Sequence, residues 1–337
     1  MRFPAPASPF FRRAFATSAS MRVPLLVTPK QLKELPKQTT LPLDASWHMP
    51  NSPRSAVAEY LHGPRIPHAR RFDLDEVAEL SVDKNPLSLT HMLPTKERFQ
   101  KELEKLGIEK DTHVVVYDSV GVFSSPRALY TFKIFGHDKV SVLDGGLPRW
   151  IQEGGEVEMG DVGDVGASDY GKIESYHKDW VRSYDEINKN AEKPLSDPST
   201  EIILDHRPAP RFTGAAPEPR PNLPSGHMPN SLSLPFTQYL NPASDKVPFS
   251  SYKPVDELKA VLVKGVGGEE RWGEVECGKK VVFSCGSGMT AAIGWLANEL
   301  VKEGGSKAAT SALYDESWTG YALREESKIS REGFYHE

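Results

Sequence analysis

The sequence has little cysteine, since only Cys277 and Cys285 occur among its 337 residues, with seven residues between them. Two cysteines cannot build a disulfide scaffold, and they are too few for a multi-cysteine zinc site. Sparse cysteine is typical of proteins that work in a reducing compartment. Any cysteine chemistry in this chain therefore depends on a single thiol.

Three further absences narrow the function. No run of eighteen apolar residues occurs, so the sequence predicts no membrane-spanning helix. The 41 lysines and arginines face 46 acidic residues, a net charge of −5, whereas nucleic-acid-binding proteins usually have a basic excess. Neither a glycine-rich dinucleotide fingerprint nor a P-loop is present. We therefore expect no membrane or nucleic-acid partner, no metal and no organic cofactor.

Acidic residues are missing from the N-terminus, where the first one is Glu34. Arginines, phenylalanines and hydroxyl residues fill the preceding segment, a composition typical of mitochondrial transit peptides. A plain disordered tail is the alternative interpretation. We interpret residues 1–22 as a segment that directs the protein to the mitochondrial matrix. A second translation start at Met21 would give a cytoplasmic form.

The length suggests two domains, and the sequence repeats itself accordingly. Each half contains a series of short apolar runs that match runs of the other half. In each half the second of these runs is followed by a helical pattern, at 126–135 and 290–303. Such alternation of strands and helices predicts βαβ units and a parallel sheet. The chain is therefore predicted to be a duplicated α/β domain. The apolar runs that match between the halves are 41–46 with 202–207, 113–118 with 280–285, and 140–143 with 311–314.

The domain boundaries follow from composition. Residues 153–172 carry many glycines and acids with little apolar periodicity, so we do not expect them to pack in a core. The proline-rich segment 208–229 is long for a connector and is predicted to be a functional loop. The segment 264–278 is predicted to be a solvated loop. We predict an N-terminal domain over 23–152, a linker over 153–178, a C-terminal domain over 179–325 and a tail over 326–337.

Cys285 opens the segment Cys-Gly-Ser-Gly-Met-Thr, between a predicted strand and a predicted helix. Gly286 and Gly288 permit a tight turn whose amides point inward, and a helix N-terminus adds partial positive charge. Such a loop favours an anion, so a cysteine held there is expected to react as the thiolate. A buried and inert cysteine is the alternative. Cys277 lies in a charged segment without this pattern and is interpreted as non-catalytic.

Two classes of cysteine enzyme fit poorly. A cysteine phosphatase needs an arginine that closes the loop six residues after the cysteine, and that position is Ala291. A cysteine protease needs a base and an oxyanion hole, for which no local signature is present. In the first half, Asp118 occupies the position of Cys285, so only the second half can supply the nucleophile.

The sequence resembles the tandem-rhodanese sulfurtransferases, in particular those members that act on 3-mercaptopyruvate. The resemblance extends roughly from Val23 to Glu325. It implies two rhodanese-like domains, each with a mainly parallel sheet flanked by helices on both faces, of which only the second holds the cysteine. The motifs that carry it are Leu43-Asp44-Ala45-Ser46-Trp47, His91-Met92-Leu93-Pro94, Val142-Leu143-Asp144-Gly145-Gly146, Arg211-Phe212-Thr213-Gly214, Pro217-Glu218-Pro219-Arg220 and the Cys285 loop.

The resemblance implies a two-step reaction through a persulfide on Cys285. The donor would be 3-mercaptopyruvate, and the acceptor a thiol such as thioredoxin or glutathione, or cyanide. By the same resemblance, Arg211 and Arg220 would bind the substrate carboxylate. A relay of Ser287, His91 and Asp75 would move a proton, in a cleft between the domains. Substrate contacts are also expected from the rest of the cysteine loop, at Gly286, Gly288, Met289 and Thr290.

The chain departs from the family pattern at two turns. Arg65-Ile66-Pro67-His68 replaces a His-Ile-Pro-Gly-like turn, which puts the local turn of the first half in doubt. In the second half, Asn230 stands where glycine is usual, and asparagine tolerates the left-handed backbone conformation.

Two rival functions remain at this stage. Thiosulfate-preferring members resemble this architecture but carry basic residues directly after the cysteine, where this chain has Gly286 and Ser287. A sulfur relay is the other rival, in which Cys285 would accept persulfide from a cysteine desulfurase for tRNA thiolation. Comparing the specificity constants of the two small donors would separate the first rival.

Overall fold

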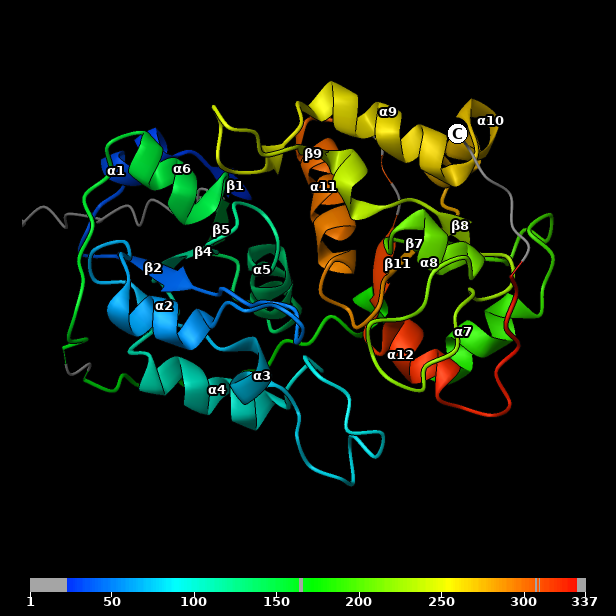
Figure 1. Ribbon diagram of the computed structural model, residues 1–337, viewed down its shortest axis with the longest axis horizontal. Coiled ribbons are helices and arrows are strands. Elements are labelled where there is room, and N and C mark those ends of the chain that lie inside the picture. Colours follow the sequence, from blue (N-terminus) through cyan, green and yellow to red (C-terminus); the bar gives the residue numbers. More distant parts are fainter. Residues whose placement is uncertain (1–22, 164–165, 307, 309, 332–337) are drawn as a thin grey trace, which may run out of the picture.

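The computed structural model describes residues 23–163, 166–306, 308 and 310–331. This part of the chain forms two five-stranded sheets that lie side by side with helices around them (Figure 1). The predicted targeting segment 1–22, with Met21, lies outside the described residues, as do residues 332–337 of the predicted tail.

The first sheet has the strand order β1-β5-β4-β2-β3, and every neighbouring pair is parallel. Its central strand β4 reads His-Val-Val-Val-Tyr and is buried throughout, as expected for a parallel strand covered on both faces. The strands are β1 (Leu26–Val27), β2 (Thr40–Asp44), β3 (Arg70–Arg71), β4 (His113–Tyr117) and β5 (Val140–Leu143).

The second sheet repeats this arrangement, with the order β6-β12-β11-β7-β8 and parallel pairing throughout. Each position has its counterpart in the first sheet, which confirms the predicted duplicated α/β fold. The strands are β6 (Val181–Arg182), β7 (Ile202–Asp205), β8 (Leu232–Ser233), β11 (Val281–Ser284) and β12 (Ser311–Tyr314), and a small antiparallel pair is formed by β9 (Leu240–Asn241) and β10 (Ser251–Tyr252).

Helices cover the sheets. In the first half they are α1 (Pro29–Glu34), α2 (Ala56–His62), α3 (Leu74–Val77), α4 (Lys96–Lys105), α5 (Ser125–Ile134) and α6 (Gly146–Gln152). In the second half they are α7 (Tyr184–Ala191), α8 (Ala209–Thr213), α9 (Val255–Val266), α10 (Glu269–Glu276), α11 (Ala291–Glu303) and α12 (Ser317–Ala322), with 3₁₀ turns at Lys178–Trp180 and Phe236–Tyr239.

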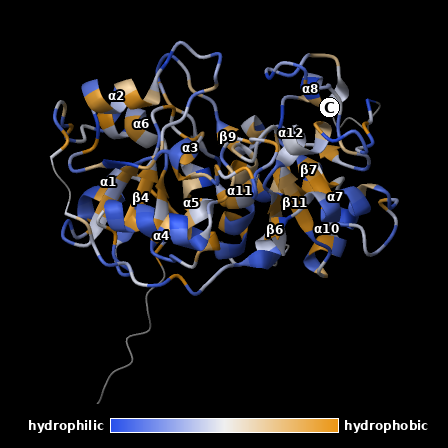
Figure 2. Ribbon diagram, turned by 90° about the horizontal axis from the view of Figure 1, so that it is seen from below, coloured by the Kyte–Doolittle hydropathy of each residue, from blue (hydrophilic) through white to orange (hydrophobic). Residues whose placement is uncertain are grey.

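Both faces of each sheet are apolar and covered. In β4, Val114 and Val116 pack with α4 and α5, whereas Val115 and Tyr117 pack with α1 and α6 on the opposite face. The second sheet alternates in the same way, between α9 and α11 on one face and α7 and α12 on the other. Figure 2 shows the result as hydrophobic strands inside helices with hydrophilic outer sides.

The domain boundaries given above, including those of the linker, stay predictions.

The two halves meet through α5 and α11, the helices that follow the Asp118 and Cys285 loops (Figure 1). Tyr130 on α5 and Trp295 on α11 form a T-shaped ring contact with centroids 5.0 Å apart. The Tyr130 hydroxyl also donates to the Trp180 carbonyl, just before β6 of the second half, at 2.8 Å. One apolar cluster runs through both halves and joins them.

Two local predictions were wrong. The segment 264–278 is largely helical, because Trp272 and Val275 on one side of α10 are buried. Tyr170, in the segment predicted to stay out of any core, is buried, and its hydroxyl lies 3.0 Å from Nδ1 of His137. The proline-rich loop contains the short helix α8, whose first turn begins after Pro208.

Both atypical turns keep a left-handed residue. His68 has φ +61° and Asn230 has φ +62°, so histidine and asparagine occupy equivalent strained positions in the two halves. Arg65 is buried, and its guanidinium binds Glu158 at 3.0 Å and three backbone carbonyls. The substituted turn is therefore intact.

No helix in the described ranges is both long enough and apolar enough to cross a membrane.

The left-handed turn gives a stability prediction. We expect His68→Gly to raise the free energy of unfolding by about 0.5–1 kcal/mol, because glycine adopts φ +61° without steric cost. His62→Gly, at an equally exposed histidine that ends α2, should lower it by a similar amount. Urea unfolding of both variants checks this, and equal losses would contradict it.

Candidate active site

Cys285 lies where β11 ends, on the loop that leads into α11. Its side chain is buried, with 2% of the residue exposed. The Cys285 amide donates to Oγ of Ser317 at 3.1 Å, and its carbonyl accepts from the Trp318 amide at 2.9 Å. These bonds to the start of α12 fix the backbone that carries the thiol.

The equivalent loop of the first half binds a carboxylate through its backbone amides. Asp118 is fully buried at the end of β4, and its carboxylate accepts bonds from five backbone amides of the loop and from the Ser125 hydroxyl. The N–H···O distances lie between 2.8 and 3.1 Å. The first half thus fills its own anion cradle with an aspartate, whereas the second half places a thiol at the corresponding position.

Glycine is required at Gly288 of the cysteine loop, and at Gly286 it leaves room for two arginine side chains. A β-carbon on Gly286 would lie 3.2 Å from Nη2 of Arg211 and 3.7 Å from Nη1 of Arg220, so both guanidinium groups lie against the loop. Gly288 has φ +78°, and a β-carbon there would lie 2.7 Å from the Asp315 carbonyl. The predicted site residues Gly286, Arg211 and Arg220 are therefore brought together.

The other predicted loop residues differ in environment. Ser287 is 8% exposed, and Met289 is a buried member of the same hydrophobic cluster as Cys285. Thr290 is the residue before α11, and its side chain makes no capping hydrogen bond.

The two arginines are held differently. Glu218, whose side chain is fully buried, pairs with Arg211 through Nε and Nη2 and with Arg207 at 2.8 Å. This fixes the Arg211 guanidinium by one edge. Arg220 donates to Oγ1 of Thr90 at 3.4 Å, and among the described residues no acidic side chain lies within ion-pair distance of it. Arg220 therefore keeps donors for an external anion.

His91 and Asp75 form a close pair. Nδ1 of His91 lies 2.5 Å from Oδ1 of Asp75, and Oδ2 of Asp75 accepts from Nε1 of Trp47 at 2.8 Å. The Trp47 ring also meets the His91 ring edge-on, with centroids 4.7 Å apart. Asp73 caps α3 by accepting from the amides of Asp75 and Glu76, which leaves the Asp75 carboxylate for His91.

Burial and neighbouring charges determine the protonation of the pair. Burial lowers the pKa of His91 below 6.5, although Asp75 opposes this shift. Burial by itself would raise the pKa of Asp75, but the contacts with His91 and Trp47 lower it overall. The site therefore holds a neutral imidazole beside a carboxylate at neutral pH. Nε2 of His91 is buried without a hydrogen-bond partner in the described structure.

The site is assembled from both halves. The Arg220–Thr90 bond joins the proline-rich loop to the segment that carries His91. Burial lowers the pKa of Arg220, and the Cys285 side chain acts in the opposite direction, as expected for two groups that are close enough to interact. No hydrogen bond joins Ser287 to His91 in the described part of the chain.

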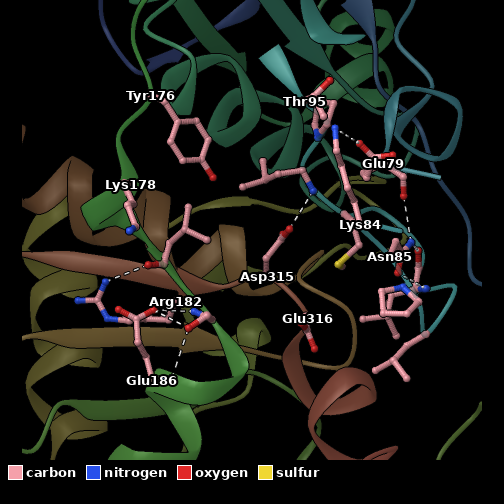
Figure 3. A pocket seen from close by; sticks show the side chains of 18 of the residues that line it. Glu79, Lys84, Asn85, Thr95, Tyr176, Lys178, Arg182, Glu186, Asp315 and Glu316 are labelled. Atoms are coloured by element: carbon pink, nitrogen blue, oxygen red, sulfur yellow. Dashed lines mark hydrogen bonds and ion pairs between the residues drawn. The ribbon is translucent and has the colours of Figure 1, made fainter. Parts of the chain in front are cut away.

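A cavity of about 390 Å³ also lies between the halves (Figure 3). It is lined by residues between 79 and 95, by Tyr176 and the start of α7, and by Asp315, Glu316 and Arg324. None of the predicted site residues is among the described residues that line it. Figure 3 shows Asp315 on its wall, with a hydrogen bond toward the first half.

The sequence did not single out several residues that build the site. Trp47 lies in a recognised motif, but its contact with Asp75 was not foreseen. Asp118 was noted only as the counterpart of Cys285, although strict alignment of the halves would have suggested its loop. Glu218 is part of a quoted motif and holds Arg211. No group of histidine, cysteine and acidic side chains suited to a metal occurs in the described residues.

The arrangement predicts how His91 titrates. By NMR we expect its pKa to lie below 6.5, because burial disfavours the imidazolium. Asp75→Asn should lower that pKa further, since the carboxylate stabilises the charged ring. His206, fully buried elsewhere with a pKa of about 4, should be unchanged and serves as the reference. A rise on Asp75→Asn would contradict the assignment.

Comparison with known proteins agrees with this geometry. A family model described as a rhodanese-like domain matches residues 28–153. A Schizosaccharomyces pombe protein named "Probable 3-mercaptopyruvate sulfurtransferase" is 37% identical over 305 residues, which cover 90% of this chain and 93% of that protein. The Arabidopsis thaliana protein "Thiosulfate/3-mercaptopyruvate sulfurtransferase 1, mitochondrial" is 36% identical over 85% of this chain and 73% of its own.

A solved structure shows the same architecture. The crystal structure of Tum1 protein from Saccharomyces cerevisiae matches with a TM-score of 0.76 and 28% identity, covering 92% of this chain and 100% of that one. The sequence-based family assignment is thus confirmed, together with the fold. The chain belongs to the rhodanese family of sulfurtransferases.

Proposed function

We propose that this enzyme takes sulfur from 3-mercaptopyruvate, holds it as a persulfide on Cys285 and passes it to an acceptor, with release of pyruvate. The observation that carries the proposal is a buried thiol at the end of the central strand, on a loop against which two arginines lie. The names of the relatives, which cover most of the chain, support the same donor.

In the first step the Cys285 thiolate attacks the sulfur of 3-mercaptopyruvate. A sulfur–sulfur bond forms and the carbon–sulfur bond breaks, leaving its electron pair on carbon as the enolate of pyruvate. The thiol proton of the substrate ends on that carbon, so the products are pyruvate and an ionised persulfide. The amides of the loop would stabilise this anion as the equivalent amides stabilise the Asp118 carboxylate.

Arg211 and Arg220 would bind the carboxylate and carbonyl of the donor. Each guanidinium lies within contact distance of the position of a Gly286 side chain, so a substrate over Gly286 reaches both. Glu218 holds Arg211 in place, which reduces the loss of side-chain freedom on binding.

The proton would move through Ser287 and His91, with Asp75 orienting the imidazole. A neutral His91 with an unpartnered Nε2 can accept a proton and return it to the enolate carbon. These roles explain why the first half, which lacks a cysteine nucleophile, supplies Trp47, Asp75 and His91 to the site.

In the second step an acceptor thiolate attacks the outer sulfur of the persulfide and releases the Cys285 thiolate. Thioredoxin or glutathione would leave with a persulfide, and cyanide would leave as thiocyanate. Thiosulfate is the alternative donor, since it appears in the name of a relative. The uncharged Gly286 and Ser287 favour 3-mercaptopyruvate.

Mass spectrometry after a pulse of 3-mercaptopyruvate tests the proposal. Wild-type enzyme and Cys277→Ser should each gain one sulfur and release an equal amount of pyruvate, because Cys277 lies outside the loop, whereas Cys285→Ser should gain none. Sulfur gained from thiosulfate alone would identify the rival donor. Sulfur gained only from a cysteine desulfurase would identify a relay, and either result would overturn the proposal.

We further propose a mitochondrial location, with a cytoplasmic form that starts at Met21. The basic, acid-free segment before Glu34 supports this, and a relative carries the word mitochondrial in its name. In cells, the full chain should enter mitochondria and a chain starting at Met21 should stay outside. Equal distribution of the two chains would contradict the targeting role, and N-terminal sequencing of both pools would locate the cleavage.

A further inference from the structure

Two aspartates at equivalent positions form hydrogen bonds between the two halves. Asp144 follows β5 and Asp315 follows β12, at matching positions of the two sheets. Asp144 accepts the Tyr252 amide of the second half at 2.9 Å, and Asp315 accepts the Leu93 amide of the first half at 2.8 Å. Each half thus holds one backbone amide of the other.

Their second partners differ. Asp144 pairs with Arg149 of its own half at 2.6 Å. Asp315 pairs at 2.6 Å with Arg127, which belongs to α5 of the other half and whose side chain is 1% exposed. The second aspartate therefore reaches across the interface twice, whereas the first does so once.

Arg127 also contacts both parts of the active site. Nη2 donates to the His91 carbonyl, and Nη1 donates to the Gly288 carbonyl at 3.4 Å. Both carbonyls belong to residues with left-handed backbone, φ +64° for His91 and +78° for Gly288. One guanidinium thus joins the histidine segment of the first half to the cysteine loop of the second.

We infer that Arg127 and Asp315 are positioning residues, which hold the cysteine loop in register with the His91–Asp75 pair during the sulfur transfer proposed above. Neither needs to touch the substrate. Asp315 fixes Arg127 by charge and Leu93 by a hydrogen bond, and Arg127 fixes the carbonyls of His91 and Gly288. The Arg127 side chain is 1% exposed, so its bonds are shielded from water, whereas the Asp315 side chain is 13% exposed and borders the cavity.

The geometry also explains why Asp315, and not the equivalent Asp144, has this positioning role. The bonds of Asp144 lie beside the Asp118 loop, where Ser250 and Tyr252 approach the first half. That cradle is already filled by Asp118 and carries no nucleophile. Only the Asp315 side holds a loop that must be aligned with groups from the other half.

Asp315→Asn tests the inference, with Asp144→Asn as the matched control. Asp315→Asn should lower kcat for pyruvate release by about 10- to 100-fold, the effect of a small misplacement of reacting groups. KM for 3-mercaptopyruvate should change less than about threefold, because Arg211 and Arg220 are untouched. Asp144→Asn should keep kcat within about twofold of wild type.

Arg127→Lys is the second variant, since lysine keeps the charge beside Asp315 but cannot bridge two carbonyls. It should show the same loss of kcat with unchanged KM. Equal kcat in Asp315→Asn and Asp144→Asn, or a loss confined to KM, would overturn the inference.

Hydrogen exchange gives a readout that does not depend on the donor. Asp315→Asn should speed exchange in peptides covering 90–94 and 286–291, and Asp144→Asn should not. Unchanged exchange in both segments would overturn the inference. Absence of pyruvate release by the wild-type enzyme would instead refute the proposed function, and hydrogen exchange would still test the pair.

Discussion

The structure depends on the loop at the end of the central parallel strand of each half, which in the first half forms an anion cradle. In the first half the Asp118 carboxylate occupies the cradle and satisfies five amides that would otherwise be buried without acceptors. In the second half the loop at the corresponding position presents Cys285. The half proposed to be reactive is therefore the one whose loop holds a thiol instead of a carboxylate at this position.

Each half supplies different groups to the candidate active site. The second half contributes the proposed nucleophile and two arginines, of which Arg211 is fixed by Glu218 and Arg220 keeps donors that no acidic side chain among the described residues occupies. The first half contributes a neutral His91 with its carboxylate partner. Burial lowers the pKa of His91 most, the Asp75 carboxylate opposes this shift, and the charges of Arg127 and Arg220 lower the pKa further.

Much of this could be predicted from the sequence, since buried parallel strands and the glycines of a tight loop leave local signals. The strands 140–143 and 311–314 were located to the residue. The α10 helix was missed because its flanking glycines and acids resemble a loop, and only the burial of Trp272 reveals its apolar side. Arg127 and Asp315 are 188 residues apart in the chain, and nothing near either one predicts their pairing.

The apolar cluster shared by α5 and α11 has a consequence for folding. Because it is continuous across both halves, neither half can lose its structure without exposing the face that the other covers. The protein should therefore unfold as one cooperative unit rather than in two stages. A half expressed alone would present the uncovered helix face, with Tyr130 or Trp295, to solvent and would tend to aggregate.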